Sequence, residues 1–190
     1  FQRLLSFFPY LVFFLFLALA DIRLRFCKTF DLQKPFKVIF GGATRTESVL
    51  RAACEASPEA ALLAVQDGAR PLVTSALIDE VVLAAQQYHA AAPAIPVTDT
   101  VKVAVNGVVE STPERSKLFA VQTPQVFDAE LLKAALQDAL RANAALTDDC
   151  SAVERFGKEV HLTDGNAENI KITRPLDLIV AEAILQSRGE

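Results

Sequence analysis

The stretch AVQDGARP at residues 64–71 marks the end of a buried strand and the start of a charged loop. Apolar residues run from 61 to 65, and an acid, a glycine, an arginine and a proline then follow closely. In open α/β sheets, ligands bind outside the carboxyl ends of the strands. Asp67 beside Arg70 can there hold a metal ion and a phosphate together. The alternative is a strand-to-loop turn with a surface ion pair, and this stretch alone leaves both interpretations open.

Strands and helices alternate on either side of this stretch, which predicts an α/β fold. The expected strands cover residues 36–40, 61–66, 94–97, 118–122, 159–162 and 170–173, and the expected helices cover residues 46–56, 75–89, 128–142, 147–157 and 173–186. Such alternation is typical of a mostly parallel sheet with helices on both faces. Residues 99–123 are nearly helix-free, and Asn106-Gly107 favours a tight hairpin there. We therefore expect a β-arm over about residues 99–123, of the kind that packs against a second subunit.

The composition excludes several classes of protein. The chain has 190 residues, a net charge of −4, three cysteines and two histidines. This length suits one domain, and the acidic balance gives no reason to expect nucleic-acid binding. The cysteines are scattered and form no Cys-x-x-Cys pair, so neither a disulfide framework nor a zinc site is indicated. Scattered cysteines favour a reducing compartment, and we expect a cytoplasmic protein.

The first forty residues differ from the rest of the chain. Ten of the 13 phenylalanines lie there, and residues 4–20 carry no charge. This run is compatible with a secretory signal, with a short transmembrane helix, with a buried parallel strand, or with residues foreign to the domain. The last two interpretations are favoured, because everything downstream is typical of a cytosolic protein, and no membrane association is expected. The expected division is an atypical apolar segment at residues 1–35 and a domain at residues 36–190.

Polar clusters at the expected strand ends and loops are candidates for chemistry. In residues 41–48, small side chains before a helix expose backbone N–H groups that suit an anion or a nucleobase edge. In residues 169–173, Lys171 lies within an apolar run, where a half-buried ammonium needs a negative partner such as a phosphate. An ordinary strand-to-helix turn and a lysine with its head in solvent are the alternatives.

A further cluster lies on the expected arm. Residues 96–102 combine threonines with a lysine, and Arg115 and Thr123 follow along the arm. Hydroxyls and cations near each other suit a phosphate monoester. A polar hairpin edge, where threonine and lysine are common, is the alternative.

Taken together, these motifs resemble the 2-C-methyl-D-erythritol 4-phosphate cytidylyltransferase family of the non-mevalonate isoprenoid pathway. The matching motifs, in order, are GGATRTESV (41–49), VQDGARPLV (65–73), IPVTDTVK (95–102), ERSKLFAVQTPQVF (114–127), LTDDCSAVE (146–154) and NIKITRPLDL (169–178). They fall in the family's order with similar spacing and cover about residues 36–187. The resemblance implies a Rossmann-like nucleotidyltransferase fold, a homodimer joined through the β-arm, and transfer of CMP from CTP to methylerythritol phosphate with Mg²⁺.

The resemblance also implies roles for individual residues. Asp67 and Lys171 are the implied catalytic residues, and Asp67 is also the implied ligand of Mg²⁺ and the bound nucleotide. Gly42 and Ser48 are implied to hold the cytidine. The implied methylerythritol phosphate pocket is lined by Arg70, Thr100 and Thr147, with Arg115 and Thr123 reaching over from the arm of the partner subunit.

One family motif has no match in residues 1–40. Members of the family begin with a glycine-rich loop, roughly Ala-Ala-Gly-x-Gly-x-Arg-Met-Gly, whose backbone wraps the triphosphate and whose cations are catalytic. Two alternatives to the main function therefore stay open. One is cytidylyl transfer to another polyol phosphate, such as ribitol 5-phosphate, and the other is an inactive truncated remnant of the enzyme.

Overall fold

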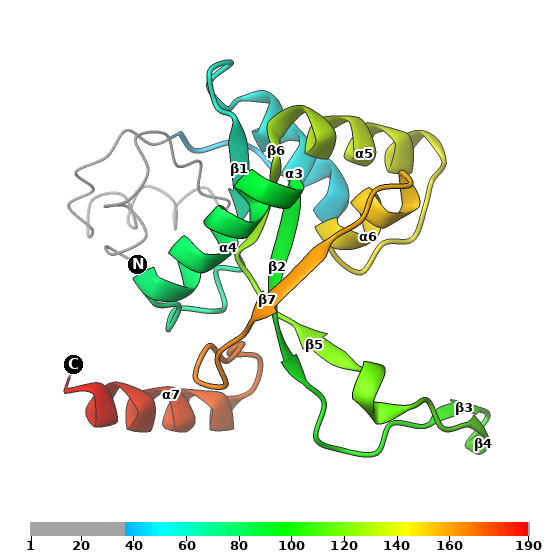
Figure 1. Ribbon diagram of the computed structural model, residues 1–190, viewed down its shortest axis with the longest axis vertical. Helices are drawn as coiled ribbons and strands as arrows, with labels where there is room; N and C mark the ends of the chain where they lie inside the picture. The colour runs from blue at the N-terminus through cyan, green and yellow to red at the C-terminus, as the bar shows by residue number, and fades with distance from the viewer. Residues whose placement is uncertain (1–36, 190) are drawn as a thin grey trace.

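The computed structural model describes residues 37–189, and Figure 1 shows their arrangement. The strands are β1 (Leu62–Val65), β2 (Ala90–Pro96), β3 (Val103–Val105), β4 (Val108–Ser111), β5 (Phe119–Val121), β6 (Gln125–Asp128) and β7 (His161–Asp164). The helices are α3 (Arg45–Cys54), α4 (Ser75–Tyr88), α5 (Ala129–Arg141), α6 (Asp149–Arg155) and α7 (Pro175–Arg188), with a 3-10 turn at Arg115–Lys117. The predicted α/β class is confirmed.

The main sheet has mixed strand directions. Its order is β1-β6-β2-β5, and β7 pairs with β2 off this path. β6 runs antiparallel to both β1 and β2, β5 runs antiparallel to β2, and β7 runs parallel to β2. The strands β1, β2 and β7 therefore share one direction, as expected of strands that alternate with helices. The expected mostly parallel sheet is found in mixed form, because β6, between β1 and β2, and β5, on the far side of β2, run the opposite way.

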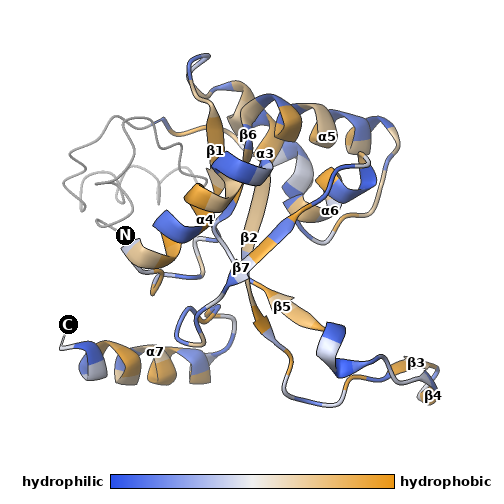
Figure 2. Ribbon diagram, viewed as in Figure 1, coloured by the Kyte–Doolittle hydropathy of each residue, from blue (hydrophilic) through white to orange (hydrophobic). Residues whose placement is uncertain are grey.

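Helices cover both faces of this sheet, as predicted. Side chains alternate along β1: Leu63 and Val65 pack into a core with α3, α5 and α6, whereas Leu62 and Ala64 pack against α4. Phe127 on β6 is fully buried at the centre of the first core. Figure 2 shows the corresponding apolar character of β1 and β2 between the helices. This period-two alternation is what a sheet between two helical layers requires.

Side-chain caps explain where the helices begin. The Thr44 hydroxyl accepts a hydrogen bond from the Glu47 N–H at the start of α3, and the Thr74 hydroxyl accepts one from the Leu77 N–H at the start of α4. An N-cap oxygen satisfies a backbone donor that the first helical turn leaves unpaired. The α6 cap is Asp148, rather than the Thr147 expected from the sequence.

The predicted hairpin is present and projects from the body (Figure 1). β3 and β4 pair antiparallel, and the connecting residues Asn106 and Gly107 both have positive φ, at 51° and 81°. A type I′ turn needs positive φ at both central positions, which Asn-Gly adopts at low cost. The apolar side chains of this hairpin are exposed, including Val108, which is 69% exposed.

Three local expectations differ from the structure. Residues 37–40 form no strand, and neither do residues 170–173. Strand β6 was not expected at all. The expected strand within residues 4–20 lies outside the described residues.

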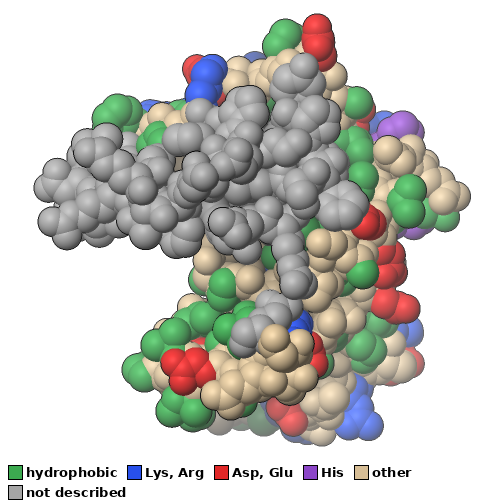
Figure 3. Space-filling view, turned by 90° about the vertical axis from the view of Figure 1, so that its left-hand side faces the viewer, with side chains coloured by type: hydrophobic (Ala, Val, Ile, Leu, Met, Phe, Trp, Pro, Cys, Tyr) green, Lys and Arg blue, Asp and Glu red, His purple; other side chains and the backbone are tan. Residues whose placement is uncertain are grey.

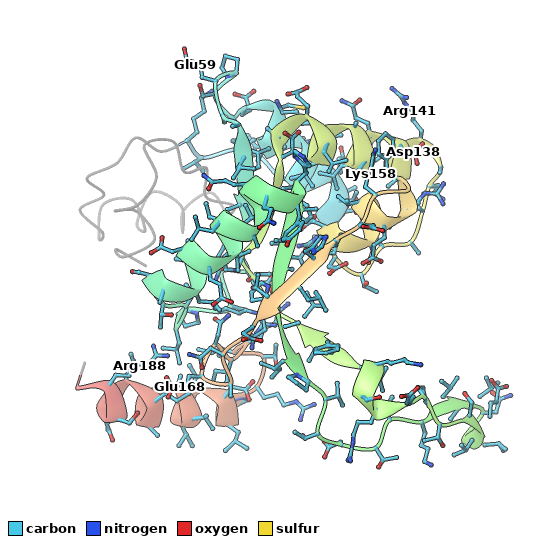
Figure 4. All side chains as sticks on the ribbon, in the orientation of Figure 1. Glu59, Asp138, Arg141, Lys158, Glu168 and Arg188 are labelled. Carbon is cyan, nitrogen blue, oxygen red and sulfur yellow. The ribbon has the colours of Figure 1, made fainter. Side chains whose placement is uncertain are left out.

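Helix α7 is tied to the body near its C-terminal end. Near its C-terminal end, Arg188 pairs with Glu168 at 2.7 Å and donates to the Leu72 carbonyl oxygen at 3.1 Å (Figure 4). Its residues Leu176 and Ile179 are each 65% exposed. Figure 3 shows hydrophobic side chains, in green, gathered at the lower end of the molecule. None of the helices within residues 37–189 has the length and apolar character needed to cross a bilayer.

Candidate active site

The centre of the site is the Asp67 carboxylate, just beyond the carboxyl end of β1. Its Oδ2 lies 2.9 Å from Lys171 Nζ and 3.7 Å from Arg70 Nε. The Asp67 backbone N–H donates to Thr123 Oγ1 at 3.0 Å, which fixes the start of the loop. The structure therefore brings together four predicted residues, Asp67, Arg70, Thr123 and Lys171, that come from three separate motifs.

Arg70 is held within this cluster. Burial lowers the pKa of the Arg70 guanidinium, and the nearby charge of Asp67 opposes that effect. Arginine nevertheless stays protonated at neutral pH, because its unperturbed pKa is very high. Arg70 is thus a fixed, largely desolvated cation, which attracts a phosphate more strongly than a cation in bulk water does.

Lys171 lies on a segment without regular secondary structure, and backbone contacts position it. The Ile172 N–H donates to the Ala69 carbonyl oxygen at 2.8 Å, which ties this segment to the Asp67 loop. The Lys171 side chain is 47% exposed, so the ammonium can reach both Asp67 and an incoming anion. The negative partner expected for Lys171 is therefore present, as the Asp67 carboxylate.

Asn169 is a buried residue of the site whose role the sequence did not reveal. It is 1% exposed, and its Nδ2 donates to the Thr123 carbonyl oxygen at 3.0 Å and to Gln122 Oε1 at 3.3 Å. The backbone carbonyl oxygen of Asn169 accepts a hydrogen bond from Arg70 Nη1 at 2.7 Å. The only sequence signal for Asn169 was its position at the start of the NIKIT motif (169–173). Asn169 joins the segment that carries Lys171 to the segment between β5 and β6 that carries Thr123.

A second part of the site is the turn before α3. Ser48 Oγ accepts a hydrogen bond from the Gly42 N–H at 2.8 Å and donates to the Thr44 carbonyl oxygen at 2.8 Å. A Cβ on Gly42 would clash with the Glu47 side chain, so this side chain lies directly against the glycine. Gly42 and Ser48 are thus brought together, as the shared motif predicted.

The loop before α6 forms the third part. Thr147 Oγ1 lies 3.1 Å from Ser151 Oγ, and the Asp148 carboxylate caps the helix. Arg45 makes a two-pronged pair with the fully buried Asp149, at 2.8 and 2.6 Å. Neither Arg45 nor Asp149 was assigned a role from the motifs, although each lies inside one of them.

Charge links this third part to the centre. Burial raises the pKa of the Asp149 carboxyl, and Arg45 opposes that rise. Burial disfavours the charged form of Arg45, but the hydrogen bond and charge of Asp149 outweigh it, and Asp67 and Asp148 add to them. The pKa of Arg45 is raised as a result. The negative charge of Asp67 therefore acts on the Arg45 guanidinium in addition to the charge of Asp149, its direct partner.

The arm residues do not join the Asp67 cluster within one chain. Thr100 and Arg115 are exposed, and Arg115 Nη1 donates to the Thr98 carbonyl oxygen at 3.1 Å. Thr123 differs from its expected placement, because it is 4% exposed and bonded to Asp67 of its own chain. Its expected reach from the arm into the pocket of a partner is corrected accordingly: Thr123 lies at the base of the arm, in the body.

The acidic groups of the site fit a Mg²⁺ ion that arrives with phosphates. Within residues 37–189, no group of three or more His, Cys, Asp or Glu side chains is arranged to hold a metal. Asp67 alone offers a carboxylate of the central cluster, with its side chain 21% exposed. Mg²⁺ typically binds one or two carboxylates and completes its shell with substrate phosphates and water. A single carboxylate beside bound phosphates satisfies that requirement.

Comparison with known proteins assigns the chain to a family. A family model described as IspD, 2-C-methyl-D-erythritol 4-phosphate cytidylyltransferase, matches residues 14–187. The chain belongs to this family. The resemblance read from the six sequence motifs is thereby confirmed.

Individual relatives agree with this assignment. The 2-C-methyl-D-erythritol 4-phosphate cytidylyltransferase of Caldanaerobacter subterraneus is 46% identical over 158 residues, which cover 83% of this chain and 70% of the relative. The same enzyme of Bacillus thuringiensis is 46% identical over 156 residues, covering 82% and 69%.

Solved structures show the same fold. The 2-C-methyl-D-erythritol 4-phosphate cytidylyltransferase of Thermus thermophilus superimposes with a TM-score of 0.72 and 39% identity, covering 82% of this chain and 74% of that chain. The 4-diphosphocytidyl-2C-methyl-D-erythritol synthase of Anaerococcus prevotii gives a TM-score of 0.78 at 31% identity, covering 87% and 76%. The predicted nucleotidyltransferase fold is confirmed.

Proposed function

We propose that this IspD-family protein transfers CMP from CTP to 2-C-methyl-D-erythritol 4-phosphate. The products are 4-diphosphocytidyl-2-C-methyl-D-erythritol and pyrophosphate, in isoprenoid precursor biosynthesis. The observation that carries the proposal is the cluster of Asp67, Arg70, Thr123 and Lys171 at the carboxyl end of β1, in a chain of this family.

The reaction forms one P–O bond and breaks another. A phosphate oxygen of the methylerythritol phosphate attacks the α-phosphorus of CTP, and the bond to pyrophosphate breaks. The protein's task is to align the two phosphates and to neutralise their charge. In this proposal Lys171 stabilises charge on the α-phosphate, and Arg70 holds the substrate's phosphate. Both cations are oriented by the same carboxylate, Asp67.

The nucleotide and the polyol are assigned to different parts of the site. Gly42 and Ser48 hold the cytidine at the start of α3, where the backbone and a buried hydroxyl are fixed. Thr147 lines the methylerythritol phosphate pocket from the loop before α6. Asp67 would hold a Mg²⁺ ion together with the nucleotide's phosphates, and the ion would supply further neutralisation of charge.

The assembly is a homodimer joined through the arm. The proposal is supported by the exposed apolar side chains of the hairpin, because exposed apolar patches mark interaction sites. The side chains of Val105, Val108, Val109 and Phe119 are all exposed. Thr100 lines the pocket, and Arg115 reaches the substrate's phosphate of the second copy, which explains why neither contacts the Asp67 cluster within one chain.

We further propose that the protein acts in the cytoplasm. The free thiols of Cys54, which is exposed, and Cys150, which is buried, fit a reducing compartment. Burial raises the pKa of the Cys150 thiol well above its usual range, which keeps it protonated and unreactive.

The experiment that tests the function is pyrophosphate release by the purified full chain with CTP and Mg²⁺. Methylerythritol phosphate and ribitol 5-phosphate are offered separately and in competition. Release dependent on methylerythritol phosphate, and preference for it in competition, is the expected result. Preference for ribitol 5-phosphate would reassign the substrate, and no release with either polyol would indicate an inactive remnant.

The dimer is tested by Val108→Asp at the tip of the hairpin. Because an unpaired buried charge costs about 3–5 kcal/mol, the dimer dissociation constant should rise about 100-fold or more. Light scattering behind size exclusion gives the mass, and pyrophosphate release gives the accompanying loss of activity. Leu83→Asp, at an equally exposed site on α4 (65%), is the matched control. A Val108→Asp protein that stays dimeric would exclude the arm as the interface.

A further inference from the structure

The Arg45–Asp149 pair connects two parts of the site that are distant in the sequence. Arg45 is the first residue of α3 and Asp149 the first residue of α6. The guanidinium donates through Nη1 to Oδ1 at 2.8 Å and through Nη2 to Oδ2 at 2.6 Å. Asp149 is fully buried, whereas the Arg45 side chain is 35% exposed. Such a two-pronged contact fixes direction as well as distance.

Gln125 adds a second tie at the same place. It is 2% exposed, and its Oε1 accepts hydrogen bonds from the N–H groups of Asp149 and Cys150 at 3.1 and 3.2 Å. Its Nε2 donates to the Asp148 carboxylate at 2.8 Å. Gln125 follows Thr123 by two residues, and Thr123 accepts the Asp67 N–H. Polar contacts therefore join the start of α3 to the start of α6 and to Gln125, and the backbone between Gln125 and Thr123 connects them to the central loop.

A purely stabilising role explains this arrangement poorly. A buried ion pair is weak evidence for stability, because desolvating two charges costs about as much as their attraction returns. Each residue of the pair instead lies next to a segment that is proposed to hold a substrate: Arg45 beside the cytidine segment, and Asp149 beside the polyol phosphate segment. Arg45 follows the turn of Gly42 and begins the helix that carries Ser48, and Asp149 follows Thr147 by two residues.

We propose that Arg45 and Asp149, with Gln125, are positioning residues that hold the cytidine turn and the polyol phosphate loop in a fixed mutual orientation. The inference rests on the proposed function, which places one substrate at each segment. Transfer needs the attacking oxygen and the α-phosphorus aligned, and a displacement of about 1 Å can cost about 10²-fold in rate. Loss of the pair should therefore affect both substrates together.

The test uses Arg45→Lys, Asp149→Asn and the double variant. Arg45→Lys keeps the positive charge beside Asp149, so it retains a folded protein while losing the two-pronged geometry. We expect each single variant to lower kcat/KM for both CTP and methylerythritol phosphate by about 10²-fold. The double variant should be no less active than the less active single variant, because residues that act as a unit are not additive.

Arg155→Gln is the matched control, because it removes an exposed ion pair between α6 and α5. Arg155 Nε lies 3.6 Å from Asp138 Oδ2, and Asp138 is labelled in Figure 4. The control should leave both kcat/KM values unchanged. Thermal melting is recorded for every variant, and kinetics are measured well below the lowest midpoint.

The outcomes separate the inference from the proposed function. With an active wild-type protein, variants that melt earlier at unchanged kcat/KM would make the pair purely structural and overturn the inference. A loss confined to one substrate would overturn it as well. An inactive wild-type protein would contradict the proposed function itself, and the inference with it.

Discussion

Replacing Lys171 with methionine is expected to lower kcat about 10²–10³-fold, the usual effect of removing one group that stabilises transition-state charge. The Lys171 ammonium lies 2.9 Å from the Asp67 carboxylate and is half exposed, so it is both oriented and accessible to a phosphate. Methionine retains the length and flexibility of the side chain but carries no charge. The measurement is steady-state pyrophosphate release with CTP and methylerythritol phosphate both varied.

The kinetic pattern separates a catalytic lysine from a binding one. If Lys171 acts mainly in the transition state, kcat and kcat/KM fall together. Lys171→Arg should recover part of the activity, because the charge returns with a different shape. Lys158→Met, at an exposed lysine on the outer surface (Figure 4), is the control and should match the wild-type rate. An unchanged kcat with a raised KM would limit Lys171 to ground-state binding.

The fold was predictable where local chemistry sets it. The start of α4 at Thr74 follows from a side-chain cap, and the hairpin turn follows from Asn106-Gly107, because these signals act over a few residues. Helix α3, which begins at Arg45 after its Thr44 cap, was expected to begin one residue later, at residue 46. Strand β6 was missed because it is short and its stability comes from pairing with both β1 and β2, which no local pattern shows.

The expected strand at residues 170–173 fails for the opposite reason. Its apolar residues resemble a strand, but the Ile172 N–H is bonded to the Ala69 carbonyl oxygen in a loop, so the segment is held by the site. The contact that this creates, between Lys171 and Asp67, was anticipated only as a lysine in need of a negative partner. The sequence could not show that Asp67 is the residue that lies beside Lys171 in three dimensions.

The same limit applies to the rest of the site. Arg45 and Asp149 lie 104 positions apart, and nothing local in either motif points to the other. Asn169 could be recognised as part of a motif but not as buried, because its burial depends on contacts with Gln122 and Thr123. The residues proposed to touch substrate were visible in the sequence through their chemistry, whereas the residues proposed to position them were visible only in three dimensions.

Replacing Asp67 with asparagine is expected to lower kcat/KM about 10²–10³-fold. The substitution preserves the shape of the side chain but removes its charge, and three consequences follow. Lys171 loses the carboxylate 2.9 Å away, the partly buried Arg70 loses its compensating charge, and Mg²⁺ would lose the protein ligand proposed for it. Because Asp67 contacts both cations, kcat/KM should fall further when Asp67 is replaced than when Arg70 alone is replaced.

A magnesium titration distinguishes the ligand role from the orienting role. If Asp67 binds the ion, the Mg²⁺ concentration at half-maximal rate should rise in Asp67→Asn, and calorimetry with Mg²⁺ and CTP should show weaker binding. If Asp67 only orients Lys171 and Arg70, the rate falls while the magnesium dependence stays at the wild-type value. Asp164→Asn, at an exposed acid that ends β7, is the control for a general change in surface charge. Wild-type kinetics in Asp67→Asn would remove this carboxylate from the catalytic centre, because no other acid within residues 37–189 lies within ion-pair distance of Lys171.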